Sequence, residues 1–276
     1  MSTKDGGARP ADGGLAGQTV VVVGGSAGIG LETAREVRAA GGEVVLAARN
    51  PDRLERAAAD LSPLSTAVFD ALDTDRLERF LHELPGRVDH VLVTAGSPSY
   101  TPLDELDLAD AGRDFGGRIA MMLAAARASR GRVRAGGTLL FIGGTGGRPP
   151  VAGMAVTGAL TAALPALTAN LALEVAPLRG NLIAAGVVDT PLSASLLGEQ
   201  LESRREQLRR TLPIGRVVGP ADVASLALHI MANGALTGAT YDIDGGQQLV
   251  APETTARLPV RPDRAATGAD GPGPRS

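Results

Sequence analysis

The feature that most constrains the fold is a regular alternation of apolar, β-branched runs with segments of helical spacing. The apolar runs are continuous rather than alternating with polar residues, so both faces of each predicted strand must be covered. Strands joined by helices in this way predict one parallel sheet with helices on both faces, a doubly wound α/β fold of the Rossmann type. The predicted strands are residues 19–23, 43–48, 65–69, 90–94, 138–142, 181–185 and 240–243. The first predicted helix runs from the glycine loop after the first strand to Ala40. The other predicted helices are residues 51–61, 73–84, 110–130, 156–175 and 220–231.

The alternation also sets the domain organisation. A chain of 276 residues has room for two domains of average size. Because the pattern runs without a break, we instead predict a single domain over residues 14–250. Residues 1–13 and 251–276 are rich in Gly, Ala, Pro and Arg and show no apolar period, so we predict that they are tails.

Composition excludes several classes of function. The net charge is −3 and the pI about 5.7, which argues against nucleic acid or an anionic membrane as partner. The chain has no cysteine and only three scattered histidines, so we predict no disulfide, no thiolate nucleophile and no metal site. We predict no membrane-spanning helix, because by our reading no apolar run approaches the ~18 residues that a span needs. The first residues also lack the apolar segment of a signal peptide, so we expect a cytoplasmic protein.

A glycine-rich loop lies between the first predicted strand and helix. It reads Gly24-Gly-Ser26-Ala-Gly28-Ile29-Gly30. Glycines allow a tight turn and let backbone N–H groups approach a pyrophosphate at the positive end of the helix. The strand–loop–helix context therefore predicts a dinucleotide site.

The end of the second predicted strand indicates which dinucleotide binds. Enzymes that use NAD present an acidic residue there to the ribose hydroxyls, whereas this chain has Ala48 followed by Arg49. A guanidinium at this position suits a 2′-phosphate, so the sequence favours NADP(H). The alternative is that Arg49 is an ordinary solvated surface charge.

These motifs resemble those of the short-chain dehydrogenase/reductase superfamily over residues 14–250. The glycines at 24, 28 and 30 resemble the family's TGxxxGxG, and Val93-Thr-Ala-Gly96 resembles its NNAG. Residues 185–190 resemble the family segment that holds the nicotinamide carboxamide, with Ala in place of Pro. The resemblance implies further cofactor contacts from Asp70, Ala71, Ala95, Gly96, Val188 and Thr190.

The same resemblance shows that the family's catalytic set is replaced. Members of the family reduce carbonyls with an Asn–Ser–Tyr–Lys tetrad, in which tyrosine is the acid and lysine lowers its pKa and holds the ribose. Counting from the matching motifs places Thr157 and Thr161 at the tyrosine and lysine positions. Gly144 stands at the serine position and Arg118 at the asparagine position.

An aliphatic hydroxyl cannot replace the phenol as proton donor, because it has no comparable ionisation. Thr157 and Thr161 share one helix face, so they form either a threonine-lined site or a packed helix interface. Arg118 could bind an anionic substrate or a developing oxyanion, or it could be an exposed or interface charge. Tyr100 is the only plausible phenolic acid. These four residues are the candidate catalytic residues.

Two hypotheses remain from the sequence. The first is an atypical NADP(H)-dependent oxidoreductase acting on a small carbonyl, iminium or conjugated substrate. The second is a non-redox protein of the same fold, either a cofactor-binding pseudoenzyme, a regulatory subunit or an isomerase or cyclase. The resemblance also implies a substrate lid over residues 191–216 and a homo-oligomer, dimer or tetramer, formed through helices 110–130 and 156–175.

Overall fold

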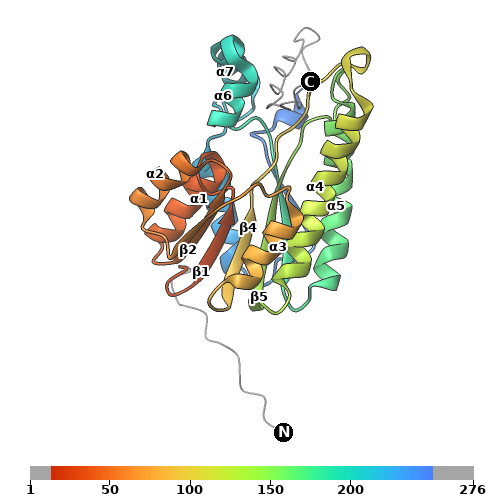
Figure 1. Ribbon diagram of the computed structural model, residues 1–276. Helices are drawn as coiled ribbons and strands as arrows, with labels where there is room; N and C mark the ends of the chain where they lie inside the picture. The colour runs from red at the N-terminus through yellow and green to blue at the C-terminus, as the bar shows by residue number, and fades with distance from the viewer. Residues whose placement is uncertain (1–13, 251–276) are drawn as a thin grey trace, which may run out of the picture.

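The computed structural model describes residues 14–250, and the two predicted tails lie outside this range. Seven parallel strands form one sheet in the order β3-β2-β1-β4-β5-β6-β7 (Figure 1). The strands are β1 (Thr19–Val23), β2 (Glu43–Ala48), β3 (Ser65–Val68), β4 (Val88–Val93), β5 (Val133–Gly144), β6 (Arg179–Ala185) and β7 (Thr240–Ile243). The predicted doubly wound parallel sheet is confirmed.

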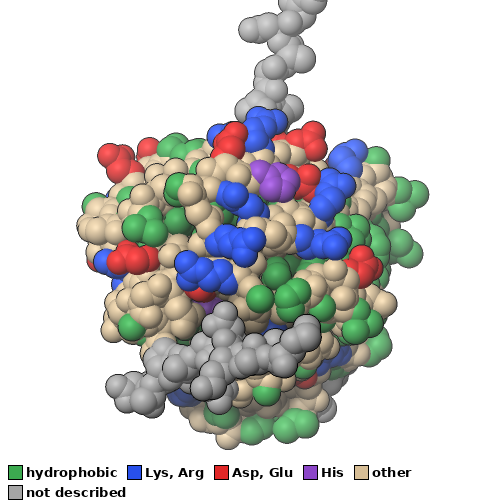
Figure 2. All heavy atoms as spheres, turned by 90° about the horizontal axis from the view of Figure 1, so that it is seen from below, with side chains coloured by type: hydrophobic (Ala, Val, Ile, Leu, Met, Phe, Trp, Pro, Cys, Tyr) green, Lys and Arg blue, Asp and Glu red, His purple; other side chains and the backbone are tan. Residues whose placement is uncertain are grey.

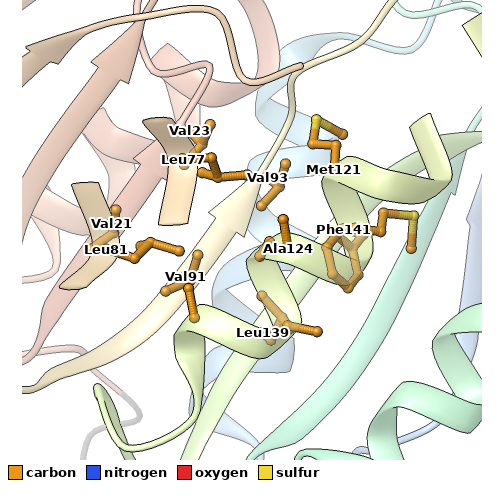
Figure 3. Packing of buried hydrophobic residues seen from close by; sticks show 14 of the residues in the cluster. Val21, Val23, Leu77, Leu81, Val91, Val93, Met121, Ala124, Leu139 and Phe141 are labelled. Atoms are coloured by element: carbon orange, nitrogen blue, oxygen red, sulfur yellow. The ribbon is translucent and has the colours of Figure 1, made fainter. Parts of the chain in front are cut away.

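Helices cover both faces of the sheet and create two separate cores. The longer helices are α1 (Gly28–Ala39), α2 (Pro51–Leu61), α3 (Thr74–Glu83), α4 (Leu108–Ser129), α5 (Ala155–Glu174) and α8 (Pro220–Ala232). One core joins the sheet to α3, α4 and α5, and the other joins it to α1, α2 and α8. Figure 3 shows the first core, in which Val21 and Val91 of adjacent strands lie near Leu81 of α3. The continuous apolar strands are thus explained by burial on both sides.

The fifth strand is longer than predicted. It begins at Val133 rather than at residue 138, and its pairing with β4 shifts in register between Val88 and His90. The first part contains exposed residues and Gly136, which adopts a φ of +78°. The sequence gives no strand signal over this irregular first part, because only the buried second part of β5 is continuously apolar.

Helix α5 corrects the prediction that no apolar run approaches the length of a membrane span. It has 20 residues and contains an 18-residue window with a mean hydropathy of 1.5, which is long and apolar enough by composition. Its inward face, which includes Leu164, Thr168 and Leu171, packs into the protein, and α5 lies against β6. The helix also runs through Pro165 as a single element.

A polar cluster is buried at the end of the sheet where the strands begin. Arg179 donates hydrogen bonds to the carbonyl oxygens of Ile230 and Met231 at 2.9 and 2.8 Å, and so satisfies acceptors at the last turn of α8. His90 lies in the same region with 3 % exposure, and its Nε2 is 2.7 Å from Oε1 of Gln18. Its Nδ1 has no hydrogen-bond partner among residues 14–250. Figure 2 views the molecule from below and shows basic side chains spread over the surface of that face.

Burial lowers the pKa of His90 to about 4; the neighbouring Asp89 opposes this shift and Arg179 adds to it. A histidine whose folded-state pKa is depressed stabilises the fold above its unfolded pKa of about 6.5, and this stability is lost as pH falls toward 4. Between pH 7 and pH 4, the unfolding free energy of His90→Gln should fall by about 3 kcal/mol less than that of the wild type, because the variant has no imidazole to protonate. Urea unfolding at several pH values measures it, with His82→Gln on the exposed face of α3 as control. Parallel acid profiles for wild type and His90→Gln would contradict the assignment.

Candidate cofactor and substrate site

The candidate site lies where the strands end, at the point where the chain order reverses between β1 and β4. There the glycine loop packs in backbone contact with the end of β4. A Cβ at Gly30 would overlap the carbonyl oxygen of Gly24 and lie 2.8 Å from the hydroxyl of Thr94. The same hydroxyl donates to the Gly24 carbonyl at 3.2 Å. Only glycine at 24 and 30 allows this approach.

The first turn of α1 provides an open anion site beside this loop. Its N-cap residue, Ala27, makes no side-chain cap, and the first turn has no acidic residue, so the N–H groups there are uncapped. Gly28 has a φ of +54°, and a Cβ added to it would lie 3.3 Å from the Thr190 methyl group. The loop therefore faces the segment after β6, and Ser26 and Ile29 are half-buried within it. This glycine cradle fits a dinucleotide pyrophosphate.

The ends of β2 and β3 place the remaining predicted nucleotide residues. Ala48 is buried, whereas Arg49 is exposed and forms no ion pair with any residue of the described range 14–250. Asp70 is exposed, and its Oδ1 accepts a hydrogen bond from the Leu72 N–H at 3.0 Å. Ala71 is buried next to it. The Arg49 side chain is thus available to a ligand.

The two threonines at the tyrosine and lysine positions are buried and engaged. The Thr157 hydroxyl donates to the Ser99 carbonyl at 2.6 Å and accepts from the Ser99 N–H at 3.1 Å. The Thr161 hydroxyl donates to the Gly146 carbonyl at 2.8 Å. These bonds tie α5 to the loops that follow β4 and β5, which is a structural role for both hydroxyls.

The remaining candidate catalytic residues come from different elements. Arg118 of α4 is half-buried, and its guanidinium donates to the backbone carbonyls of Ala95 and Ile142, at the ends of β4 and β5. Gly144 ends β5 without any side chain to bind a substrate oxygen. Tyr100 lies in the loop after β4, where burial raises its pKa and nearby Arg204 opposes that effect. The raised pKa keeps the Tyr100 phenol protonated at neutral pH.

The predicted lid region contains two helices, α6 (Pro191–Leu197) and α7 (Leu201–Thr211). Arg205 of α7 forms an ion pair with Asp189 at 2.7 Å, which joins α7 to the segment that carries Val188 and Thr190. Sequence reasoning missed this pair, as it missed the bidentate pair of Arg148 with Asp242 at 2.6 and 2.8 Å. No sequence pattern marks either pair, because the partners come from separate elements that only the fold brings together.

Comparisons with known proteins agree with this geometry. Residues 23–248 match the family model described as enoyl-(acyl carrier protein) reductase. The short-chain dehydrogenase/reductase ATR9 of Stachybotrys chlorohalonatus is 30 % identical over 84 % of this chain and 97 % of its own length. The structure of the MalC reductase/Diels-Alderase of Malbranchea aurantiaca superposes with a TM-score of 0.79 at 24 % identity, over 86 % and 98 % of the two chains. BdcA in complex with NADPH superposes with a TM-score of 0.74 at 26 % identity, over 92 % and 99 %.

Proposed function

Because the chain belongs to the short-chain dehydrogenase/reductase superfamily, we propose that it is an NADP(H)-dependent oxidoreductase that works without the family's tyrosine and lysine. The observation that carries the proposal is Arg49, exposed and without an ion pair among residues 14–250, together with a glycine cradle that side chains would fill. A fold kept only as a scaffold has no need for both features. The structure of BdcA with NADPH supports the same choice of cofactor.

Each predicted cofactor residue then has a distinct task. Arg49 pairs with the 2′-phosphate, and the uncapped N–H groups at the start of α1 hold the pyrophosphate. Asp70 and Ala71 border the adenine. A further group, Ala95, Gly96, Val188 and Thr190, borders the nicotinamide half. When bound, NADPH supplies a hydride, and the protein orients the acceptor and excludes water.

The replaced tetrad restricts the acceptor. Reduction of a simple ketone needs a positioned acid, which typically contributes ~10²–10⁴ in rate. Both hydrogen-bonding functions of the Thr157 hydroxyl are used by Ser99, so Thr157 has no proton to give. An iminium, a quinone or a conjugated system needs less acid assistance, and we propose an acceptor of this kind.

Removal of the Thr157 hydroxyl tests that assignment. We expect Thr157→Val to lower the unfolding free energy by about 1–3 kcal/mol, because it leaves the Ser99 backbone groups without their partner. We expect the rate of hydride transfer at saturating NADPH to change less than about threefold, far below the loss seen when a general acid is removed. Chemical unfolding and single-turnover NADPH oxidation measure the two effects. A hundredfold slower transfer with normal cofactor binding would make Thr157 a catalytic residue.

The proposal as a whole is tested with a panel of acceptors. Oxidation of NADPH that carries deuterium at both C4 positions is followed with iminium, quinone, conjugated enone and plain ketone compounds. Product is detected by deuterium on carbon for all classes except the quinones, for which hydroquinone is measured because its O–H hydrogens exchange with water. We expect reduced product from one of the first three classes and none from the plain ketones. Tight NADPH binding without reduced product from any acceptor would overturn the redox function.

One observation favours a second candidate function. MalC of Malbranchea aurantiaca is both a reductase and a Diels-Alderase by name, which indicates that this fold can host a cyclisation. A pocket that lacks the tyrosine acid is compatible with a non-redox isomerase, a cyclase or a regulatory subunit that binds the cofactor. Consumption of a substrate without any change in the NADPH concentration would identify this case.

We also propose that the chain forms a homo-oligomer through α4 and α5. Leu123 and Leu173 on these helices are 45 % and 81 % exposed, and a groove of about 480 Å³ lies between the helices. Contiguous exposed apolar patches mark association surfaces, and we propose that these side chains belong to one such patch. Light scattering of the purified protein measures the mass, and a monomer at micromolar concentration would contradict the proposal.

A further inference from the structure

The guanidinium of Arg118 lies at the edge of the sheet where ligands of this fold bind. Its Nη1 donates to the Ala95 carbonyl after β4, and its Nη2 donates to the Ile142 carbonyl in β5. It also packs directly on Gly96, since a Cβ at that position would overlap Nη1 and lie 2.7 Å from Cζ. In open α/β sheets the ligand lies outside these carboxyl ends of the strands.

This cation has no anionic partner among the residues that the structure describes. Among residues 14–250, no carboxylate lies within ion-pair distance of Arg118, and its two hydrogen bonds go to neutral carbonyl groups. Burial lowers its pKa to about 10, so the side chain is still charged at neutral pH. A buried charge is normally paired or fully hydrogen-bonded, so the missing counter-charge points to a ligand.

Comparison with the buried Arg179 makes the point sharper. Arg179 donates from all three of its nitrogen atoms, and its acceptors lie within the fold. Arg118 uses only Nη1 and Nη2, and its Nε makes no hydrogen bond to a described residue. Arg118 as a whole is partly exposed, and its two printed hydrogen bonds use two of the five N–H donors of a guanidinium. Arg179 is therefore completed by the protein, whereas Arg118 has N–H donors left for a ligand.

We propose that Arg118 binds an anionic group of the substrate, and that the substrate of this protein is a small carboxylate. This inference rests on the proposed function, because it places the substrate beside the predicted nicotinamide segment. A phosphate of the cofactor is the other source of negative charge in the site. The glycine loop and Arg49 already provide for the cofactor phosphates, so we assign the Arg118 donors to the substrate.

Binding of matched acids and amides tests the proposal. Benzoate and trans-cinnamate are titrated into the protein saturated with NADP⁺, alongside benzamide and cinnamamide, and binding is followed by calorimetry. We expect each carboxylate to bind at least about tenfold more tightly than its amide, because a charge-assisted pair is lost in the neutral compound. Equal affinity of acid and amide, including no detectable binding of either, would overturn the proposal.

Variants identify the residue and separate the two sources of charge. In Arg118→Gln the preference for the carboxylate should disappear, whereas in Arg118→Lys part of it should remain. Arg113→Gln is the matched control, because Arg113 lies on the same helix, is exposed and pairs with Asp110.

NADP⁺ affinity is measured for every variant and should change less than about threefold, which also shows that the variants fold. A tenfold loss of NADP⁺ affinity in Arg118→Gln, or an unchanged carboxylate preference, would contradict the assignment to the substrate. Failure of the proposed function is distinguishable, since it appears as absent NADP⁺ binding in the wild type.

Discussion

Replacing Gly30 with alanine is expected to weaken NADPH binding by about 10- to 100-fold. The added Cβ overlaps the backbone carbonyl of Gly24, which cannot move away easily because the Gly24 N–H is bonded to the Ala47 carbonyl at 2.7 Å. The methyl group also lies 2.8 Å from the Thr94 hydroxyl, so the loop must separate from β4. Overpacking of this kind costs typically 1–3 kcal/mol, and here it displaces the N–H groups that hold the pyrophosphate.

The measurement is a titration with NADPH followed by nicotinamide fluorescence, together with chemical unfolding of the same variant. Gly112→Ala is the control, because a Cβ at this position in α4 meets nothing within 4 Å. We expect this variant to bind NADPH normally and to gain up to about 1 kcal/mol of stability from better helix propensity. Normal NADPH binding by a folded Gly30→Ala variant would contradict the placement of the cofactor on this loop.

The second large effect is expected at Arg49. Its guanidinium is exposed and unpaired among the described residues, so Arg49→Ala removes no ion pair from the fold. A hydrogen-bonded pair between a guanidinium and a phosphate contributes about 1.5–3 kcal/mol, which corresponds to a loss of about 10–100-fold in NADPH affinity. NADH lacks the 2′-phosphate, so its affinity should stay within about twofold.

The Arg49 experiment compares both cofactors with wild type and variant, which isolates the contribution of the 2′-phosphate. Arg53→Ala is the matched control, since Arg53 is an exposed arginine at the start of the helix that follows Arg49. It should bind NADPH as the wild type does. An equal loss for NADPH and NADH in Arg49→Ala would show that Arg49 acts on the fold or on another part of the cofactor.

The fold could be predicted because its signals are local and repeated. Each strand that is buried on both faces is continuously apolar, as in Thr19–Val23, and each connecting helix has its own period. The start of β5 could not be predicted in this way, because Arg134 to Gly136 are exposed and irregular. The apolar character of α5 is not evident from the sequence pattern, because short alanine side chains raise the mean hydropathy of a helix without forming an apolar stripe along one face.

The candidate site could be predicted only where one segment carries it. The glycine loop contains its own signal in the spacing of Gly24, Gly28 and Gly30, and the close approach of Thr94 explains that spacing. By contrast, the sequence left two possibilities for Thr157, because the backbone of Ser99 that uses its hydroxyl lies 58 positions away. The charge of Arg118 was visible, but the absence of a counter-ion among residues 14–250 is a property of the folded chain.

The central claim is that this chain binds NADP(H) through Arg49 and the glycine cradle as the basis of a redox reaction. The most direct test is a titration of the unmodified protein with NADPH and with NADH under identical conditions. We predict saturable binding of both, with NADPH bound at least about tenfold more tightly. Binding of neither cofactor, or equal affinity for the two, would contradict the claim.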